Sequence, residues 1–237
     1  MSLTLVWDGQ THLFESRAHP RGSVHHNALV VKRLQKHIHL LLIGILGAEP
    51  SGSAILKIAR EADEISALEQ EAVIYANQLK SIQGKYVPEF YGIYHGEVMG
   101  SPVACMLLEY CTPGARISPD ERNRKIMLAA CAVHAAGLMH CELLSGHNLV
   151  MSGKDIKIVD FSGAVPHRCY GATPTLHPGR GGDSSQGCRE LVALERVYGV
   201  FSGAAFPAAS PGFVNPFAEE NVLYVLARRV VGMVMPQ

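Results

Sequence analysis

Residues 137–162 read GLMHCELLSGHNLVMSGKDIKIVDFS, and this stretch decides the fold. Two short apolar runs flank the turn residues 152–155, a pattern that predicts a β-hairpin. The hairpin brings Asp160, which follows its second strand, back toward Asn148, which precedes its first. Together with Glu142, these side chains offer two carboxylates and an amide. Such a set suits the binding of a divalent metal and the positioning of a hydroxyl group for phosphoryl transfer.

The composition describes a chain with a sizeable hydrophobic core and no strongly charged face. Of 237 residues, 48% are hydrophobic, and the formal net charge is zero with His neutral. The length allows one large domain or two lobes, each with its own core. A neutral chain gives no basic surface for phosphate backbones, so nucleic acid is not an expected partner.

The cysteines, residues 1–10 and the apolar runs indicate the cellular compartment of the protein. The six cysteines form no C-x-x-C pair, which favours reduced and mostly buried thiols. Residues 1–10 lack the basic and apolar regions of a signal peptide. The most apolar runs, residues 40–48 and 221–235, are too short or too interrupted by Arg to span a bilayer. We therefore expect no membrane partner and a cytoplasmic protein, with the nucleus as the alternative.

Both ends of the chain carry weaker structural signals than its middle. Residues 1–36 are predicted to be an N-terminal extension with one possible hairpin over residues 4–14. Residues 166–187 and 202–215 are rich in Gly, Pro and small residues and predict loops. Helices are predicted over residues 188–198 and from residue 215 onward.

Residues 37–59 predict a strand, a turn containing Gly44 and Gly47, and a second strand with Lys57 at its centre. An ammonium group inside an apolar strand is costly to bury unless it is paired. The alternative is that Lys57 points outward from an edge strand.

The next segment offers Lys57 a counter-charge. Apolar residues recur at helical spacing from Ile65 to Ile82 and form one stripe. Glu64 and Glu71 lie on the same flank of this stripe. Glu71 is in the middle of the helix, where position is best defined, so we predict a pair between Lys57 and Glu71. The alternative is a solvated face with ordinary surface acids.

Two further strands, a connector and a helix complete the pattern. Residues 84–100 predict a strand, and residues 103–110 are apolar enough for a strand buried on both faces. Residues 109–111 then lead into a connector between two halves. Residues 118–121, Ser-Pro-Asp-Glu, predict a capped helix N-terminus. His134 lies on this helix, and we predict a structural role for it rather than a ligand role.

This order of elements resembles the protein kinase-like fold over residues 40–165, including divergent kinases and small-molecule phosphotransferases. The resemblance implies an α+β, two-lobed fold. Its N-lobe, residues 37–111, would be a small antiparallel sheet with one helix and would bind nucleotide. Its C-lobe, residues 112–237, would be shortened and mainly helical, with residues 137–162 as a catalytic-loop-like segment.

The resemblance also implies ATP and Mg²⁺ as cofactors. A strand lysine of this family holds ATP phosphates, a helix glutamate orients that lysine, and the hinge backbone pairs with adenine. The residues implied for nucleotide binding are Lys57, Glu71, Glu109, Cys111, Gly44 and Gly47. The glycines depart from the G-x-G-x-x-G spacing of the family.

In the second half, Asn148 and Asp160 match the metal-holding positions, and Glu142 stands where the family has its catalytic Asp. Together with Lys57 and Asn148, Glu142 forms the implied catalytic set. The interval from Glu142 to Asn148 is one residue longer than the family pattern, so His147 is the alternative at the metal position. Imidazole suits Zn²⁺ better than Mg²⁺. Ser162 replaces the Gly of Asp-Phe-Gly.

The implied function is a weakly active or degenerate phosphotransferase that acts on a hydroxyl group of a protein or a small molecule. One alternative is a pseudokinase, a nucleotide-binding or protein-interaction scaffold that keeps the fold. Another is an α+β domain in which the motifs coincide by chance.

Overall fold

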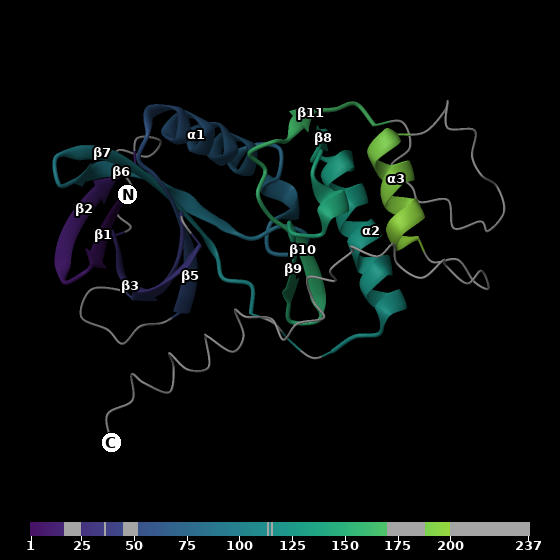
Figure 1. The fold of residues 1–237 in the computed structure, drawn as a ribbon, viewed down its shortest axis with the longest axis horizontal. Coiled ribbons are helices and arrows are strands. Elements are labelled where there is room, and N and C mark those ends of the chain that lie inside the picture. Colours follow the sequence, from purple (N-terminus) through teal and green to yellow (C-terminus); the bar gives the residue numbers. More distant parts are fainter. Residues whose placement is uncertain are drawn as a thin grey trace, which may run out of the picture. The chain divides into compact units, whose positions relative to one another are not determined.

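The computed structural model describes residues 1–16, 25–35, 37–44, 52–112, 114, 116–169 and 188–199. It divides into two compact units. Unit 1 comprises Met1–Lys80 and Pro88–Tyr110, and unit 2 comprises Ser81–Val87 and Cys111–Gln237. The architecture mixes α and β, with a large sheet in unit 1 and helices in both units (Figure 1).

Seven strands of unit 1 form a closed barrel in the order β1-β2-β6-β7-β5-β4-β3. β1 pairs in parallel with β3, and the remaining neighbours are antiparallel. The strands are β1 (Ser2–Trp7), β2 (Gln10–Glu15), β3 (His25–Gln35), β4 (Ile38–Gly44), β5 (Gly52–Ala59), β6 (Phe90–Val98) and β7 (Ser101–Glu109).

Two tight turns set the twist of the barrel hairpins. Asp8 and Gly9 connect β1 to β2 with φ values of 49° and 77°, and Met99 and Gly100 connect β6 to β7 with 54° and 77°. Positive φ at both central residues is typical of type I′ turns, whose twist matches that of the flanking strands. The hairpin predicted over residues 4–14 is present.

Residues 1–36 do not form a separate extension, which corrects the sequence-based expectation. β1 lies between β2 and β3 and closes the barrel. Leu3 and Leu5 of this strand are fully buried in the core. The predicted small antiparallel sheet is therefore a closed barrel with one parallel pair, because strands before residue 36 complete its hydrogen bonding.

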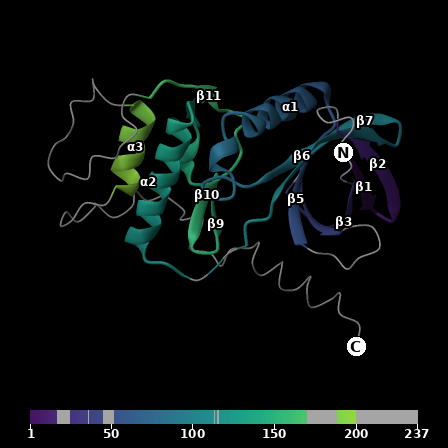
Figure 2. The same ribbon diagram turned by 180° about the vertical axis from the view of Figure 1, so that it is seen from behind.

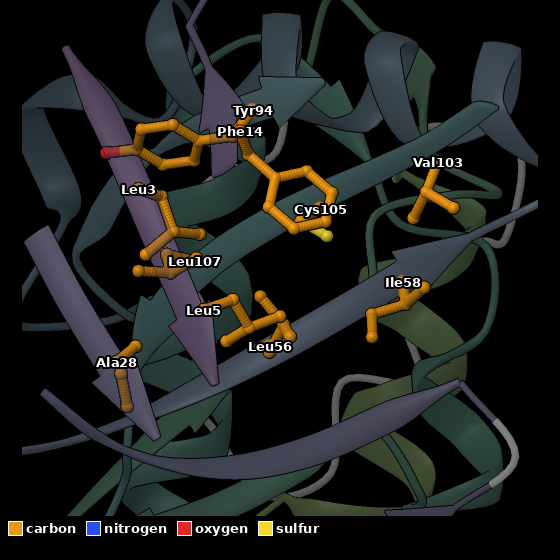
Figure 3. Close-up of a cluster of buried hydrophobic side chains, with 11 residues drawn as sticks. Leu3, Leu5, Phe14, Ala28, Leu56, Ile58, Tyr94, Val103, Cys105 and Leu107 are labelled. Carbon is orange, nitrogen blue, oxygen red and sulfur yellow. The ribbon is translucent and has the colours of Figure 1, made fainter. Parts of the chain in front are cut away.

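The interior of the barrel follows the period-2 alternation of its strands. Leu56 and Ile58 of β5 and Cys105 and Leu107 of β7 belong to one buried cluster. Figure 3 shows these side chains directed toward one another and toward Leu5 of β1. The intervening residues of these two strands therefore point to the outer face of the barrel.

The helix α1 (Ala62–Ala76) contacts β5, β6 and β7. Both views place it along β6 and β7 (Figures 1 and 2). All residues from Val103 to Leu108 are buried, so the prediction of a strand buried on both faces is confirmed. The helix ends at Ala76, earlier than the apolar stripe predicts, and a 3₁₀ turn η1 (Lys80–Ile82) follows.

The described part of unit 2 is built on two helices and short paired strands. Its elements are α2 (Pro119–Ala135), β8 (Leu138–Met139), η2 (Leu143–Ser145), β9 (Leu149–Ser152), β10 (Asp155–Ile158), β11 (Val165–Pro166) and α3 (Arg189–Tyr198). The predicted cap is present, because Ser118 Oγ accepts the Glu121 N–H at 3.2 Å and Pro119 opens α2. α2 packs against α3 and β10.

Three predictions lie outside the described residues: the turn position of Gly47, most of the loop over 166–187, and everything from residue 200 onward. Of the helices that the structure describes, none is long and apolar enough to cross a membrane.

Candidate functional site

Lys57 and Glu71 form an ion pair within unit 1. Lys57 lies between the inward residues Leu56 and Ile58, so its side chain leaves the barrel on the side that α1 covers. Its Nζ donates to Glu71 Oε2 at 2.6 Å. The Lys57 side chain is 17% exposed and that of Glu71 only 1%. The predicted pairing is thus confirmed.

The alternatives for these residues do not hold. β5 is an inner strand between β4 and β7, so Lys57 does not point outward from an edge. Glu64 is occupied elsewhere: it forms a reciprocal capping box with Glu61 at the start of α1 and lies 3.6 Å from His37 Nε2. Glu71 pairs with Lys57 because it lies in the middle of the helix, whereas Glu64 lies in its first turn.

The predicted adenine-pairing residues lie where the two units divide. Tyr110 is the last residue of unit 1 and Cys111 the first of the following part of unit 2. The Glu109 N–H donates to Glu89 O at 2.9 Å, and the Glu109 carboxylate accepts the Glu89 N–H at 3.0 Å. These bonds hold the end of β7 in place. Gly44 is the last residue of β4.

In unit 2 a short strand pair encloses the predicted catalytic segment. β8 and β11 pair antiparallel, and between them run η2 and the hairpin of β9 and β10. The Val159 N–H donates to Asn148 O at 3.0 Å. The hairpin prediction is therefore confirmed, and it brings the backbone just before Asp160 next to Asn148.

His140 links the two sides of this segment. It is fully buried, and its Nε2 donates to Val159 O at 3.0 Å. Its ring packs against Phe161 with 4.9 Å between the centroids. Its Nδ1 lies 3.4 Å from the Glu142 N–H, which donates to it. One histidine thus ties the backbone before Glu142 to the backbone before Asp160.

Glu142 is exposed, and its carboxylate lies beside the residues that follow Asp160. A Cβ placed on Gly163 would stand 3.5 Å from Cδ of Glu142. Between Glu142 and Asn148 runs η2, whose C-cap Gly146 has a left-handed φ of 74°. His147 is exposed and Asn148 half-buried.

Asp160 and Cys141 have left-handed backbones outside any hairpin turn, with φ values of 65° and 73°. Such conformations cost roughly 1–2 kcal/mol for a residue with a Cβ, although Asp tolerates them better than most. Observed strain of this kind is concentrated at functional sites. The Asp160 carboxylate also accepts a hydrogen bond from Ser162 Oγ at 2.9 Å.

Glu190, on the first turn of α3, supports this backbone and was not predicted from the sequence. Its carboxylate accepts the N–H groups of His140 and Cys141, at 3.1 and 2.6 Å, and the Nε2–H of His134 at 2.7 Å. Burial raises the pKa of Glu190, but the hydrogen bonds from His134, His140 and Cys141 outweigh it and lower that pKa below its ordinary value. An acid in the first turn of an apolar helix was the only signal in the sequence.

The donor chemistry of unit 2 fits a hard divalent cation. Asp160 offers a carboxylate and Asn148 an amide oxygen, and Mg²⁺ prefers oxygen ligands. Glu142 adds a second carboxylate on the same segment. In unit 1, the Lys57 ammonium is fixed by Glu71 and suits a phosphate group.

No family model and no curated protein sequence matches this chain. Among solved structures, the crystal structure of a kinase domain is similar, with a TM-score of 0.44 and 14% sequence identity. The match covers 59% of this chain and 51% of that domain, so the chain spans about half the length of the structure it matches. A similarity of this size carries no argument about activity.

Proposed function

We propose that this protein is a kinase-like phosphotransferase, of weak activity, that uses ATP and Mg²⁺ and transfers phosphate to a hydroxyl group. The observation that carries the proposal is the part-buried pair of Lys57 and Glu71. Glu71 holds the ammonium in one place. A fixed cation of this kind can bind phosphate oxygens, and the resemblance in element order assigns it to those of ATP.

The residues of unit 2 support the metal-dependent part of the proposal. Asp160 and Asn148 would hold the Mg²⁺, which when bound neutralises charge on the phosphate oxygens. The ties from His140 and Glu190 position the backbone on which Asp160 and Glu142 stand. Fixed positions matter because phosphoryl transfer depends mainly on positioning and charge stabilisation.

Glu142 would accept the proton of the attacking hydroxyl. Its side chain is one methylene longer than that of Asp, so its carboxylate is displaced by up to about 1.5 Å. A misplacement of about 1 Å can lower a rate on the order of a hundredfold. Weak activity is therefore the expectation, with a protein or a small molecule as the acceptor.

A direct binding measurement tests the proposal that the chain binds ATP. Titration calorimetry with Mg-ATP, carried out below the melting transition, should show binding to the full chain that Lys57→Met and Asp160→Asn each reduce. The exposed Lys80 gives a matched control, because Lys80→Met removes the same charge away from the predicted site. Equal binding by all variants, or no heat from the unmodified chain at millimolar ATP, would reject nucleotide binding at these residues.

Transfer of labelled phosphate from ATP tests the proposed phosphotransferase activity. The full chain should label itself, a generic protein or an aminoglycoside-like acceptor above an Asp160→Ala control. Binding without transfer would favour the second candidate, a pseudokinase that binds nucleotide as a scaffold. The Ser162 hydroxyl on Asp160 Oδ1 favours this candidate, because it occupies one acceptor position of the carboxylate that would hold the metal.

A further inference from the structure

Four side chains that are distant in the sequence meet in unit 2, and none of them is among the residues predicted for metal binding or catalysis. His134 lies on α2, His167 and Cys169 follow β11, and Cys188 is the N-cap of α3. One ligand atom from each residue lies within 4.8 Å of the corresponding atoms of the other three. We propose that these four residues form a structural zinc site that none of the motifs above requires.

The identity of the donors selects the metal. Two thiolates and two imidazoles are a donor set of structural Zn²⁺ sites, which are tetrahedral and closed. Bond lengths of about 2.3 Å to sulfur and about 2.0 Å to nitrogen place neighbouring ligand atoms roughly 3.3–3.8 Å apart. Cys188 Sγ lies 3.4 Å from His134 Nδ1, which is already within this range. Mg²⁺ prefers oxygen ligands and does not favour this set of sulfur and nitrogen donors.

His134 is oriented as a metal ligand. Glu190 is a carboxylate and can only accept, so Nε2 of His134 carries the proton in the 2.7 Å bond between them. In the neutral imidazole the other nitrogen, Nδ1, is the acceptor that can bind a metal, and it faces Cys188. A carboxylate behind the ring fixes the tautomer of ligating histidines in many metal sites. The side chain of His134 has no exposed surface.

His167 supplies an independent observation. Its Nε2 is buried and has no hydrogen-bond partner among the described residues. A buried polar atom without a partner is costly and calls for an explanation. The ring lies edge-on to His134, with 5.2 Å between the centroids. A metal ion would satisfy this nitrogen.

The backbone brings the second pair of donors into place. The His167 N–H donates to Gly137 O at 2.8 Å, which extends the β8–β11 pairing toward the C-terminal end of α2. In an extended chain, residues two apart point to the same side, so His167 and Cys169 both face α2. An open pocket lined by His134, Gly137, His167 and Cys169 gives an ion access.

Metal content tests the proposal in the full chain. Protein purified without chelators should hold zinc at one ion per chain, and Cys169→Ser with Cys188→Ser should lose it. Cobalt substitution should give the near-ultraviolet thiolate-to-cobalt band together with tetrahedral visible bands. Cys141→Ser is the matched control, because Cys141 is an exposed cysteine of the same unit outside the cluster, and it should keep the metal.

A second measurement needs no substitution and tests zinc binding even if the variants fail to fold. Zinc should protect Cys169 and Cys188 from alkylation, and a chelator should abolish the protection, while Cys141 reacts in both states. Three results would overturn the proposal. They are substoichiometric zinc in protein refolded with zinc, a disulfide between Cys169 and Cys188 in the purified chain, and rapid alkylation of Cys188 despite zinc. The last result would indicate a reactive thiol beside His134 instead.

Discussion

At the residue scale, the Lys57–Glu71 pair is more a constraint than a source of stability. Taking both charges out of water costs several kcal/mol, which their attraction offsets only when the geometry is good. The 2.6 Å separation provides that geometry. Because removing one partner takes the nearest opposite charge away from the other inside the protein, the pair is more sensitive to single substitutions than a surface ion pair is.

We therefore predict that Lys57→Met lowers the free energy of unfolding by about 3 kcal/mol, because buried Glu71 loses the cation that it contacts at 2.6 Å. Urea denaturation followed by tryptophan fluorescence measures this, since Trp7 is the only tryptophan and lies in β1 of unit 1.

Adding Glu71→Leu to Lys57→Met should recover part of the loss, since no charge then remains buried. Lys80→Met, at an exposed position, is expected to stay within about 0.5 kcal/mol of the unmodified protein. A double variant less stable than Lys57→Met alone would contradict this account.

At the element scale, α2 begins with a set of interactions that respond to pH. The Glu121 carboxylate accepts two hydrogen bonds from Arg124, one from Nε at 2.7 Å and one from a terminal nitrogen at 2.8 Å. The Arg124 hydrogen bonds, with smaller contributions from the Arg124 and Lys125 charges, lower the pKa of Glu121 to about 2 from its ordinary 4.5. Negative charge in the first turn also favours the helix dipole.

Because the folded pKa is depressed, the contribution of Glu121 to stability is present above pH 4.5 and lost as the pH falls toward 2. We predict that Glu121→Gln lowers the melting temperature at neutral pH and that the difference from the unmodified protein shrinks across this window. Thermal melts at several pH values measure it.

Solvent and salt screen this exposed pair, so the difference should be small and smaller still in high salt. In an Arg124→Ala background the effect of Glu121→Gln should be smaller, because only Lys125 and the helix dipole then act on the carboxylate. A difference that is constant from neutral pH down to pH 2 would show that the ion pair is not its cause.

At the scale of the whole molecule, closure of the barrel makes the N-terminal strands part of the core of unit 1. Leu5 of β1 is fully buried, whereas Leu13 of β2 is 58% exposed. If residues 1–36 were a separate extension, both positions would tolerate truncation of the side chain equally.

We predict that Leu5→Ala destabilises unit 1 by about 2–5 kcal/mol, the usual cost of removing a core leucine. Leu13→Ala, the matched control, should change stability by no more than about 0.5 kcal/mol. Urea denaturation monitored through Trp7 reports both. Similar stabilities for the two variants would mean that β1 contributes nothing to the barrel.

Local signals made much of the candidate site predictable. The pairing of Lys57 with Glu71 followed from the cost of an unpaired ammonium. The hairpin between Asn148 and Asp160 followed from two apolar runs around a polar turn. The start of α2 followed from Ser118 and Pro119. Each depends on residues close in sequence or on one strong energetic requirement.

Other parts of the site depended on contacts without a local signature. The two-residue strands β8 and β11 are too short for alternation to show. Glu190 meets the backbone of His140 and Cys141 across about fifty residues of chain. Nothing in the sequence near His134 indicates that Cys188 will approach it, so a structural role for that histidine was the natural prediction.

The sequence by itself determined the elements whose periodicity, caps and turns are local, together with the one ion pair that burial demands. Only the tertiary structure decided that residues 1–36 close a barrel, and that two histidines and two cysteines converge beside Glu190. The physical reason is that strand pairing and ligand clustering depend on which distant surfaces pack together, and short-range propensity carries no information about that. Residues 137–162 thus contain the predicted metal-binding residues and Glu142, while contacts from α3 and β11 support the backbone of that stretch.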